Sequence, residues 1–226
     1  MPVVNVEYTT RNEEKFEGYL TKPKGDGPFP GILIITAIFG VDDGMIELAD
    51  AWASDGFIVS VPDIFWRQVS GPTADMEVAK GRMNDFDPDQ GMKDIEDLLG
   101  DLRNRSECNG KVGILGFCFG GRYVHLSAAR LGVDAGVSFH GTAIGQHLDE
   151  TSNITCPVSH HFGGDDPAVP MDEVNAIKEA YSQNPNADIG IYPGIGHNFS
   201  MPNKPGYDES AANISRSAAL RIFRSM

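Results

Sequence analysis

The sequence predicts an α/β fold, with a mostly parallel sheet of about eight strands and helices on both faces. Two observations lead to this prediction. Apolar, β-branched runs alternate along the chain with segments of helical apolar spacing, which is typical of right-handed β-α-β crossovers. A Gly-x-Cys-x-Gly segment over residues 116–120 lies between one such run and one such helix. With 226 residues and 41% hydrophobic content, the chain predicts one domain over residues 1–226.

The first part of the chain predicts an antiparallel pair at one edge of the sheet. Apolar residues alternate with polar ones over residues 4–8 and again over 16–20, which is the period of a strand with one covered face. Residues 31–36 and 57–61 are continuous apolar runs, as expected for strands that are covered on both faces. Apolar side chains recur on one helical stripe in two segments, and helices are predicted over 45–53 and 91–102.

The same alternation continues to the end of the chain. Strands are predicted over 111–117, 135–140, 158–163 and 189–192, and helices over 119–130, 171–181 and 207–224. Parallel sheets of this kind form their sites at the carboxyl ends of the strands. The residues that follow each strand are therefore the first candidates for a function.

Composition limits the classes of function. A formal net charge of −14 disfavours nucleic acid and anionic membrane surfaces as partners. No stretch approaches the ~20 apolar residues that cross a bilayer, and residues 1–5 lack the pattern of a signal peptide. Three scattered cysteines fit a reducing cytoplasm, and no Cys/His spacing resembles a zinc site. We therefore expect a cytoplasmic protein without a metal site.

The segment Gly116-Phe117-Cys118-Phe119-Gly120 has the form of a nucleophile elbow, the strand-turn-helix of α/β-hydrolases. Small flanking residues are needed because the turn is tight and its central residue has a strained backbone. Cys118 is therefore the predicted nucleophile. An oxyanion hole needs two backbone donors, and we expect the N–H of Phe119 and that of Ile38, in the turn after strand 31–36.

A thiol nucleophile needs a base, and the base needs a group that orients it. In α/β-hydrolases the chain order is nucleophile, acid, histidine. Strand 158–163 is followed by Asp165 and Asp166, and strand 189–192 by a Gly-rich loop that contains His197. His197 is the predicted base, and both aspartates are candidates for the acid. Of the other histidines, His125 is predicted to pack in the core, and His140 is a candidate for lining the site.

Short segments spread along the chain resemble the dienelactone hydrolase family. They are Ile38-Phe39-Gly40-Val41, Val61-Pro62-Asp63-Ile64-Phe65, Gly110-Lys111-Val112-Gly113, Gly116-Phe117-Cys118-Phe119-Gly120-Gly121, Gly163-Gly164-Asp165-Asp166, Val169-Pro170 and Gly196-His197-Asn198-Phe199. The elbow cysteine followed by two glycines is the specific part. The resemblance covers essentially the whole chain and implies an α/β-hydrolase fold, a monomer, and cofactor-free hydrolysis of lactones or esters. It also implies a triad of Cys118, His197 and Asp166.

Two departures from that family bear on the substrate. Thr36-Ala37 stands where the family has a glutamate that contacts the resting thiol, and Met201 stands where it has an arginine for the substrate carboxylate. These departures argue against dienelactone itself and favour a neutral or mainly apolar small ester, lactone or thioester. Four residues are expected to line the substrate pocket: Phe39, Trp66, Phe199 and Met201. Arg67 and Arg82 leave some room for an anion.

The resulting prediction is a carboxylic ester hydrolase that acts on small esters or lactones through an acyl-cysteine intermediate. Two alternatives stay open. The same triad would serve an acyltransferase or a thioester hydrolase. The missing glutamate and arginine would also fit a catalytically weak ligand-binding protein that kept the fold.

Overall fold

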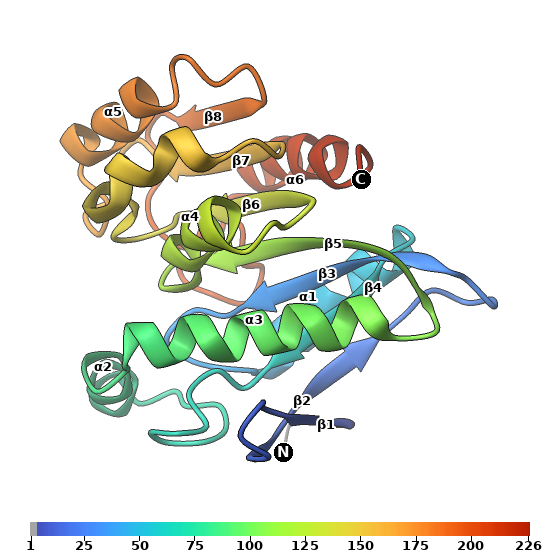
Figure 1. Cartoon of the computed structure of the whole chain (residues 1–226). Helices are drawn as coiled ribbons and strands as arrows, with labels where there is room; N and C mark the ends of the chain where they lie inside the picture. The colour runs from blue at the N-terminus through green and yellow to red at the C-terminus, as the bar shows by residue number, and fades with distance from the viewer. Residues whose placement is uncertain (1–3) are drawn as a thin grey trace. The chain divides into compact units, whose positions relative to one another are not determined.

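The computed structural model describes residues 4–226, and the chain divides into two compact units, Met1–Val112 and Gly113–Met226 (Figure 1). None of the described helices is both long and apolar enough to cross a membrane. The single domain expected over residues 1–226 stays a prediction. The expectation about a signal peptide falls in part on residues 1–3, which lie outside the described residues.

In the described part of the first unit, β1, β2, β4 and β3 are neighbours in that order. They are β1 (Val6–Thr9), β2 (Lys15–Thr21), β3 (Phe29–Ile35) and β4 (Ile58–Pro62). The pairs β1–β2 and β2–β4 are antiparallel, and β3–β4 is parallel, so the predicted antiparallel pair is confirmed. Tyr8 lies opposite Phe16, and their ring centroids are 5.5 Å apart. Gly18 leaves room for this pair, because a Cβ there would lie 2.6 Å from the Tyr8 ring.

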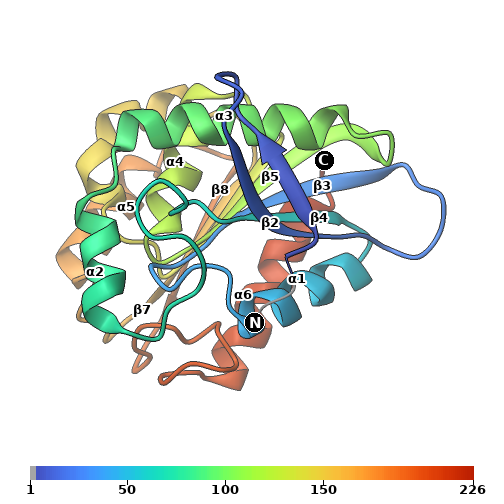
Figure 2. The same cartoon turned by 90° about the horizontal axis from the view of Figure 1, so that it is seen from below.

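The helices in the described part of the first unit are α1 (Asp43–Ser54), α2 (Met76–Asn84) and α3 (Pro88–Asn104). Each begins after an aspartate whose carboxylate accepts a backbone N–H of the first turn: Asp42, Asp75 and Asp87. Figure 2 shows α1 and α3 on opposite sides of β2, β3 and β4. Helix α2 was not predicted, because its buried residues are only Ala79 and Arg82 and form no apolar stripe.

The second unit is built on parallel strands in the order β5-β6-β7-β8. They are β5 (Cys108–Phe117), which enters this unit at Gly113, β6 (Ala135–Phe139), β7 (Val158–Gly163) and β8 (Ala187–Tyr192). Every residue of β6 and β7 is buried, as expected for strands that are covered on both faces. The carboxyl ends of these four strands lie at one edge, where Cys118, His140, Asp166 and His197 follow them.

The helices of the second unit cover both faces of its strands. They are α4 (Gly120–Arg130), the 3₁₀ segment η1 (Ile144–Asn153), α5 (Met171–Ala180) and α6 (Glu209–Phe223). Gly113 and Gly116 face opposite sides of β5: a Cβ at Gly113 would lie 2.7 Å from Phe223 of α6, and one at Gly116 2.7 Å from Val124 of α4. Figure 2 shows α4 and α5 on one side of β7 and β8 and α6 on the other.

A buried hydrogen-bond chain joins helices of the second unit and confirms His125 as a core residue. Its Nε2 donates to the backbone carbonyl of His147 (2.8 Å), so its Nδ1 accepts from the Tyr181 hydroxyl (2.8 Å). The Tyr181 oxygen then accepts from Nε2 of His160 (3.0 Å). The segment η1 was not predicted, because a kink at His147 (φ −132°) interrupts its helical period.

Candidate active site

Cys118 lies in a sharp turn between β5 and α4, with a left-handed φ of +51° that is uncommon for residues other than glycine. Its N–H donates to the carbonyl of Phe139 (3.1 Å), and its own carbonyl accepts from the N–H of Gly121 (2.9 Å). A Cβ at Gly116 would collide with the carbonyl of Gly120, and one at Gly121 with Cα of Gly141. The turn therefore requires glycine at 116 and 121, and it holds a partly exposed thiol at the carboxyl end of β5.

Asp166 follows β7 and is 4% exposed, whereas its neighbour Asp165 is exposed. One carboxylate oxygen of Asp166 accepts the N–H of Ala168 (2.8 Å), and the other lies 2.7 Å from Nδ1 of His197. The N–H of Asp165 donates to the carbonyl of Ile195 (2.9 Å), in the loop that carries His197. Of the two aspartates that the sequence left open, Asp166 is therefore the one in contact with the histidine.

His197 lies in the loop after β8, between Asp166 and Cys118. Its Nδ1 binds Asp166, so its Nε2 is the nitrogen that is left for the hydrogen bond with the Cys118 thiol. Burial lowers the pKa of His197, but the hydrogen bonds and charges of Asp166 and Cys118 outweigh it and raise this pKa to about 9. At neutral pH the imidazole therefore holds its proton and places a positive charge beside the Cys118 sulfur.

His140 lies directly beside His197. Its ring centroid is 4.6 Å from that of His197, and the two planes meet at 65°. The strand predicted over 135–140 ends at Phe139, because His140 turns to a left-handed φ of +41° while its N–H donates to the carbonyl of His161 (2.7 Å). Burial, and then the charge of His197, hold the pKa of His140 well below its ordinary value, so its ring is neutral.

The residues expected to line the substrate pocket fall in both units. Phe199 and Met201, in the second unit, are buried, and the Phe199 ring centroid is 5.1 Å from that of Tyr192. Phe39, in the first unit, is half-buried. Trp66, also in the first unit, stacks on Phe16 at 4.9 Å and carries the guanidinium of Arg67 at 4.0 Å. A role for these four in binding substrate stays a prediction.

The predicted oxyanion donors are the N–H groups of Phe119 and Ile38. Phe119 is the N-cap of α4, where the backbone N–H groups of a helix point outward from its end. Ile38 belongs to a turn in which the N–H of Gly40 donates to the carbonyl of Ala37 (3.1 Å). Since C=O and N–H point in opposite directions across a trans peptide, the Ile38 N–H points out of this turn.

Arg82 holds the Ile38 turn by a contact that the sequence did not reveal. Its side chain is buried, and its Nε and Nη2 both donate to the carbonyl of Ile38 (2.9 and 2.6 Å). Its Nη1 donates to the carbonyls of Gly71 (2.7 Å) and Val69 (3.2 Å). Backbone carbonyls leave no residue-type signature, so no pattern could have identified these partners.

Arg67, the other arginine considered for an anion, is engaged by two carboxylates. Its guanidinium donates to both oxygens of Glu14 (2.8 and 2.6 Å) and to both oxygens of Asp94 (3.0 and 3.1 Å). Bidentate pairs of this geometry are the strong form of the arginine–carboxylate contact. Arg67 and Arg82 therefore both have partners within the first unit.

The other candidate reactive groups are clusters of metal-ligating side chains and the two remaining cysteines. Across residues 4–226 no group of three or more His, Cys, Asp or Glu side chains is placed to hold a metal ion. The three cysteines are free, Cys108 is buried, and burial raises the pKa of the half-buried Cys156.

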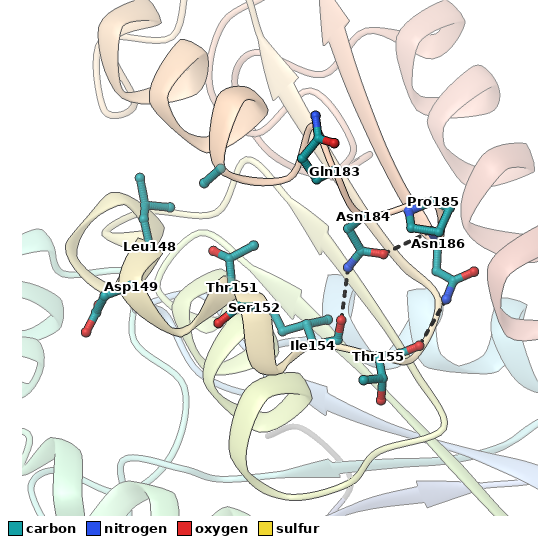
Figure 3. A pocket seen from close by; sticks show the side chains of 11 residues that line it. Leu148, Asp149, Thr151, Ser152, Ile154, Thr155, Gln183, Asn184, Pro185 and Asn186 are labelled. Atoms are coloured by element: carbon teal, nitrogen blue, oxygen red, sulfur yellow. Dashed lines mark hydrogen bonds between the residues drawn. The ribbon is translucent and has the colours of Figure 1, made fainter.

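A surface groove of about 540 Å³ lies between η1 and the segment that leads into β8 (Figure 3). Its lining is mostly small or neutral polar, and two asparagines tie its walls together. Asn184 donates to the carbonyl of Ile154 (3.0 Å), and Asn186 donates to that of Thr155 (3.1 Å). These residues precede β7 and β8, so the groove lies at the amino ends of the strands, opposite to Cys118. It therefore plays no part in the chemistry of the thiol.

Known proteins resemble this chain over nearly its whole length. The sequence model of the dienelactone hydrolase family matches residues 16–226. A carboxymethylenebutenolidase of Pseudomonas putida is 31% identical, over 90% of this chain and 89% of that protein. The crystal structure of a provisionally named dienelactone hydrolase of Klebsiella pneumoniae matches this chain with a TM-score of 0.87. The match covers 98% of both chains, and the sequence identity is 25%.

A third relative is a dienelactone hydrolase-like promiscuous phosphotriesterase from metagenomic libraries. Its crystal structure has a TM-score of 0.84 at 24% identity, over 97% of this chain and 96% of that one. Together with the eight mostly parallel strands and their helices, these likenesses confirm the predicted α/β-hydrolase fold.

Proposed function

The chain belongs to the dienelactone hydrolase family and is a hydrolase that acts on esters, and on that premise we propose that it works through an acyl-cysteine intermediate at Cys118. The observation that carries the proposal is His197, held between the Asp166 carboxylate and the Cys118 thiol. Nucleophile, base and orienting group are the three parts that covalent catalysis needs. We assign those roles to Cys118, His197 and Asp166.

In the first half of the reaction, the Cys118 thiolate attacks the carbonyl carbon of the ester. The negative charge moves to the carbonyl oxygen, where the N–H of Phe119 receives it, and the N–H of Ile38 stays a prediction as the second donor. Each such donor is worth roughly 3 kcal/mol in related sites. His197 then gives its Nε2 proton to the leaving oxygen, the C–O bond breaks, and an alcohol departs. The acyl group stays on Cys118 as a thioester.

The second half of the reaction needs His197 as a base, and acylation itself prepares it. Two of the influences that raise the pKa of His197 come from the Cys118 thiol, as a hydrogen bond and as a charge. Both are lost in the thioester, whereas burial continues to lower the pKa. The imidazole, which has given its Nε2 proton to the leaving alcohol, therefore stays neutral and takes a proton from a water molecule, which attacks the thioester. Collapse expels the thiolate and frees the acid.

We propose neutral, mainly apolar esters or lactones as substrates. Met201 is buried where the family resemblance expects an arginine, and Arg67 and Arg82 already have partners. A matched pair of esters tests this: p-nitrophenyl butyrate and mono-p-nitrophenyl succinate, which ends in a carboxylate. We expect kcat/KM to favour the neutral ester by at least about tenfold, because burying an unpaired charge is costly. A preference for the succinate would overturn the substrate proposal.

The covalent step is tested by intact mass spectrometry of the enzyme quenched during turnover of p-nitrophenyl acetate. We expect one added acyl group in the wild type and in Cys156→Ala, and none in Cys118→Ala. An adduct that forms without turnover would favour an acyltransferase, and an added alcohol acceptor would then release it. Equal, adduct-free behaviour of the wild type and Cys118→Ala would favour the ligand-binding alternative.

A further inference from the structure

His140 combines two features that each raise the energy of a folded chain. Its backbone is left-handed, at φ +41°, where residues other than glycine are uncommon. Its side chain is 0% exposed, yet neither ring nitrogen has a hydrogen-bond partner among the described residues. A buried polar group without a partner is normally selected against. A residue with both features calls for a compensating role.

The residue type itself indicates which role. The left-handed region is favoured by glycine and, among other residues, by Asn, Asp and His. Of these, only His carries an aromatic ring. A position that needs a left-handed backbone together with a flat ring is therefore met by His, even where its nitrogens bond to nothing.

The ring of His140 is placed against the candidate base. Its centroid lies 4.6 Å from His197 at 65°, 5.8 Å from Phe199 at 76° and 6.2 Å from Phe117 at 48°. Edge-to-face pairs at such distances are a preferred aromatic geometry. The polar groups that face His197 are the Asp166 carboxylate, the Cys118 thiol and the neutral His140 ring. His197 is thus held at Nδ1, at Nε2 and across its ring.

We propose that His140 is a positioning residue, whose ring fixes the plane of the His197 imidazole so that Nε2 stays aligned with the Cys118 thiol. The inference rests on the proposed function, because it assigns His197 the role of base. The left-handed backbone aims the ring, the contact at 4.6 Å transmits the constraint, and the ring nitrogens take no part.

Three substitutions separate the ring from the backbone preference. His140→Phe keeps a ring and loses the nitrogens, whereas His140→Asn and His140→Gly accept the left-handed backbone and lose the ring. Ala143→Gly is the matched control, since Ala143 is a second left-handed residue in the same loop (φ +59°) and lies outside the proposed machinery. Urea unfolding verifies that each variant folds, and two ringless variants guard against the failure of one.

Two measurements test the alignment. The first is kcat and KM for p-nitrophenyl butyrate. The second is the rate of Cys118 alkylation by iodoacetamide at about pH 6.5, divided by the rate at about pH 9.5, where any thiol is largely ionised. We expect the Asn and Gly variants to lose at least about tenfold in kcat with KM nearly unchanged, because misplacement acts on the transition state. Their alkylation ratio falls at least about fivefold, because a misaligned imidazolium stabilises the thiolate less.

We expect Ala143→Gly to stay within about threefold of the wild type in both measurements. His140→Phe should lose less kcat and less of the alkylation ratio than the Asn and Gly variants, although it is less stable because a phenyl ring does not favour the left-handed backbone. Ringless variants with wild-type kcat and alkylation ratio would overturn the inference, and so would a Phe variant as impaired as they are. If the Asn and Gly variants had a lower free energy of unfolding but an unchanged alkylation ratio, His140 would have only a structural role, and the inference would also be overturned. The proposed function has its own test, because it is wrong if the wild type forms no acyl adduct. The alkylation ratio does not depend on that adduct, so it tests His140 in either case.

Discussion

Replacing Asp166 by Asn removes the charge that faces His197 and keeps the size of the side chain. The carboxylate lies 2.7 Å from Nδ1 and is fully buried, so its charge acts on the imidazole with little screening. An asparagine amide can also donate to Nδ1 and so place the histidine proton on the wrong nitrogen. We therefore expect both the pKa of His197 and the rate of hydrolysis to fall.

The size of the effect follows from the pKa. A value of about 9, against the ordinary 6.5, corresponds to about 3 kcal/mol in favour of the imidazolium. This is a net value, since burial opposes it, so Asp166 and Cys118 together contribute more than that. If Asp166 supplies half, Asp166→Asn lowers the pKa of His197 by at least about one pH unit and kcat/KM by about 10³-fold. NMR titration measures the pKa of His197, and the rates of ester hydrolysis at constant buffer concentration give kcat/KM.

The matched control for this substitution is Asp165→Asn. It removes the same charge from the adjacent residue, whose side chain is exposed. We expect wild-type hydrolysis and an unchanged His197 titration in Asp165→Asn. Equal losses in the two variants would show that net charge rather than contact is responsible. An unchanged His197 pKa in Asp166→Asn would refute the reasoning directly.

Three further outcomes are expected in unfolding experiments. Because the pKa of His197 is raised in the folded state, its protonation stabilises the fold by up to about 3 kcal/mol below about pH 6.5. This contribution is lost as the pH rises through about 9. In urea unfolding, His197→Gln should therefore remove the fall of the unfolding free energy between these two pH values. Gly121→Ala should lower the free energy of unfolding by about 2 kcal/mol or more, because the added Cβ would collide with Gly141. The control Gly100→Ala, where the added Cβ meets no atom, should raise it by up to about 1 kcal/mol, because Ala is the better helix former in α3. Arg82→Met should lower the free energy of unfolding by roughly 2–4 kcal/mol, because three backbone carbonyls lose the buried guanidinium that donates to them. Lys80→Met, at an exposed ion-pair partner on the same helix, should change little, and similar losses in both would contradict this.

Periodicity predicted the elements whose apolar residues form a continuous run or stripe, and it missed α2 and η1, which lack one. Strands β6 and β7 are buried at every residue, and their apolar runs are visible in the sequence. Helix α2 buries only Ala79 and Arg82, so nothing in its pattern separates it from a loop. The end of β6 was also missed, because the left-handed turn at His140 depends on a contact with His161 that lies outside the strand itself.

The candidate site was predictable where chain order carries the information. Cys118, an aspartate and His197 follow strands β5, β7 and β8, and parallel strands bring their carboxyl ends to one edge. The choice between Asp165 and Asp166 rested on family resemblance, since adjacent residues share the same position in the pattern. In the structure the contacts of this loop separate them. The hydrogen-bond partners of Arg82 could not be predicted, because they are backbone carbonyls, which are the same at every residue.

The placement of the three free thiols offers a practical use for the unaltered chain. Cys108 is buried, burial raises the pKa of Cys156, and the partly exposed Cys118 lies beside the protonated imidazole of His197. A fluorescent maleimide or a surface linker applied in mildly acidic buffer should therefore attach at one defined position. Counting attached dye per chain would then give the concentration of competent sites in any preparation, without a substrate and without removing the other cysteines.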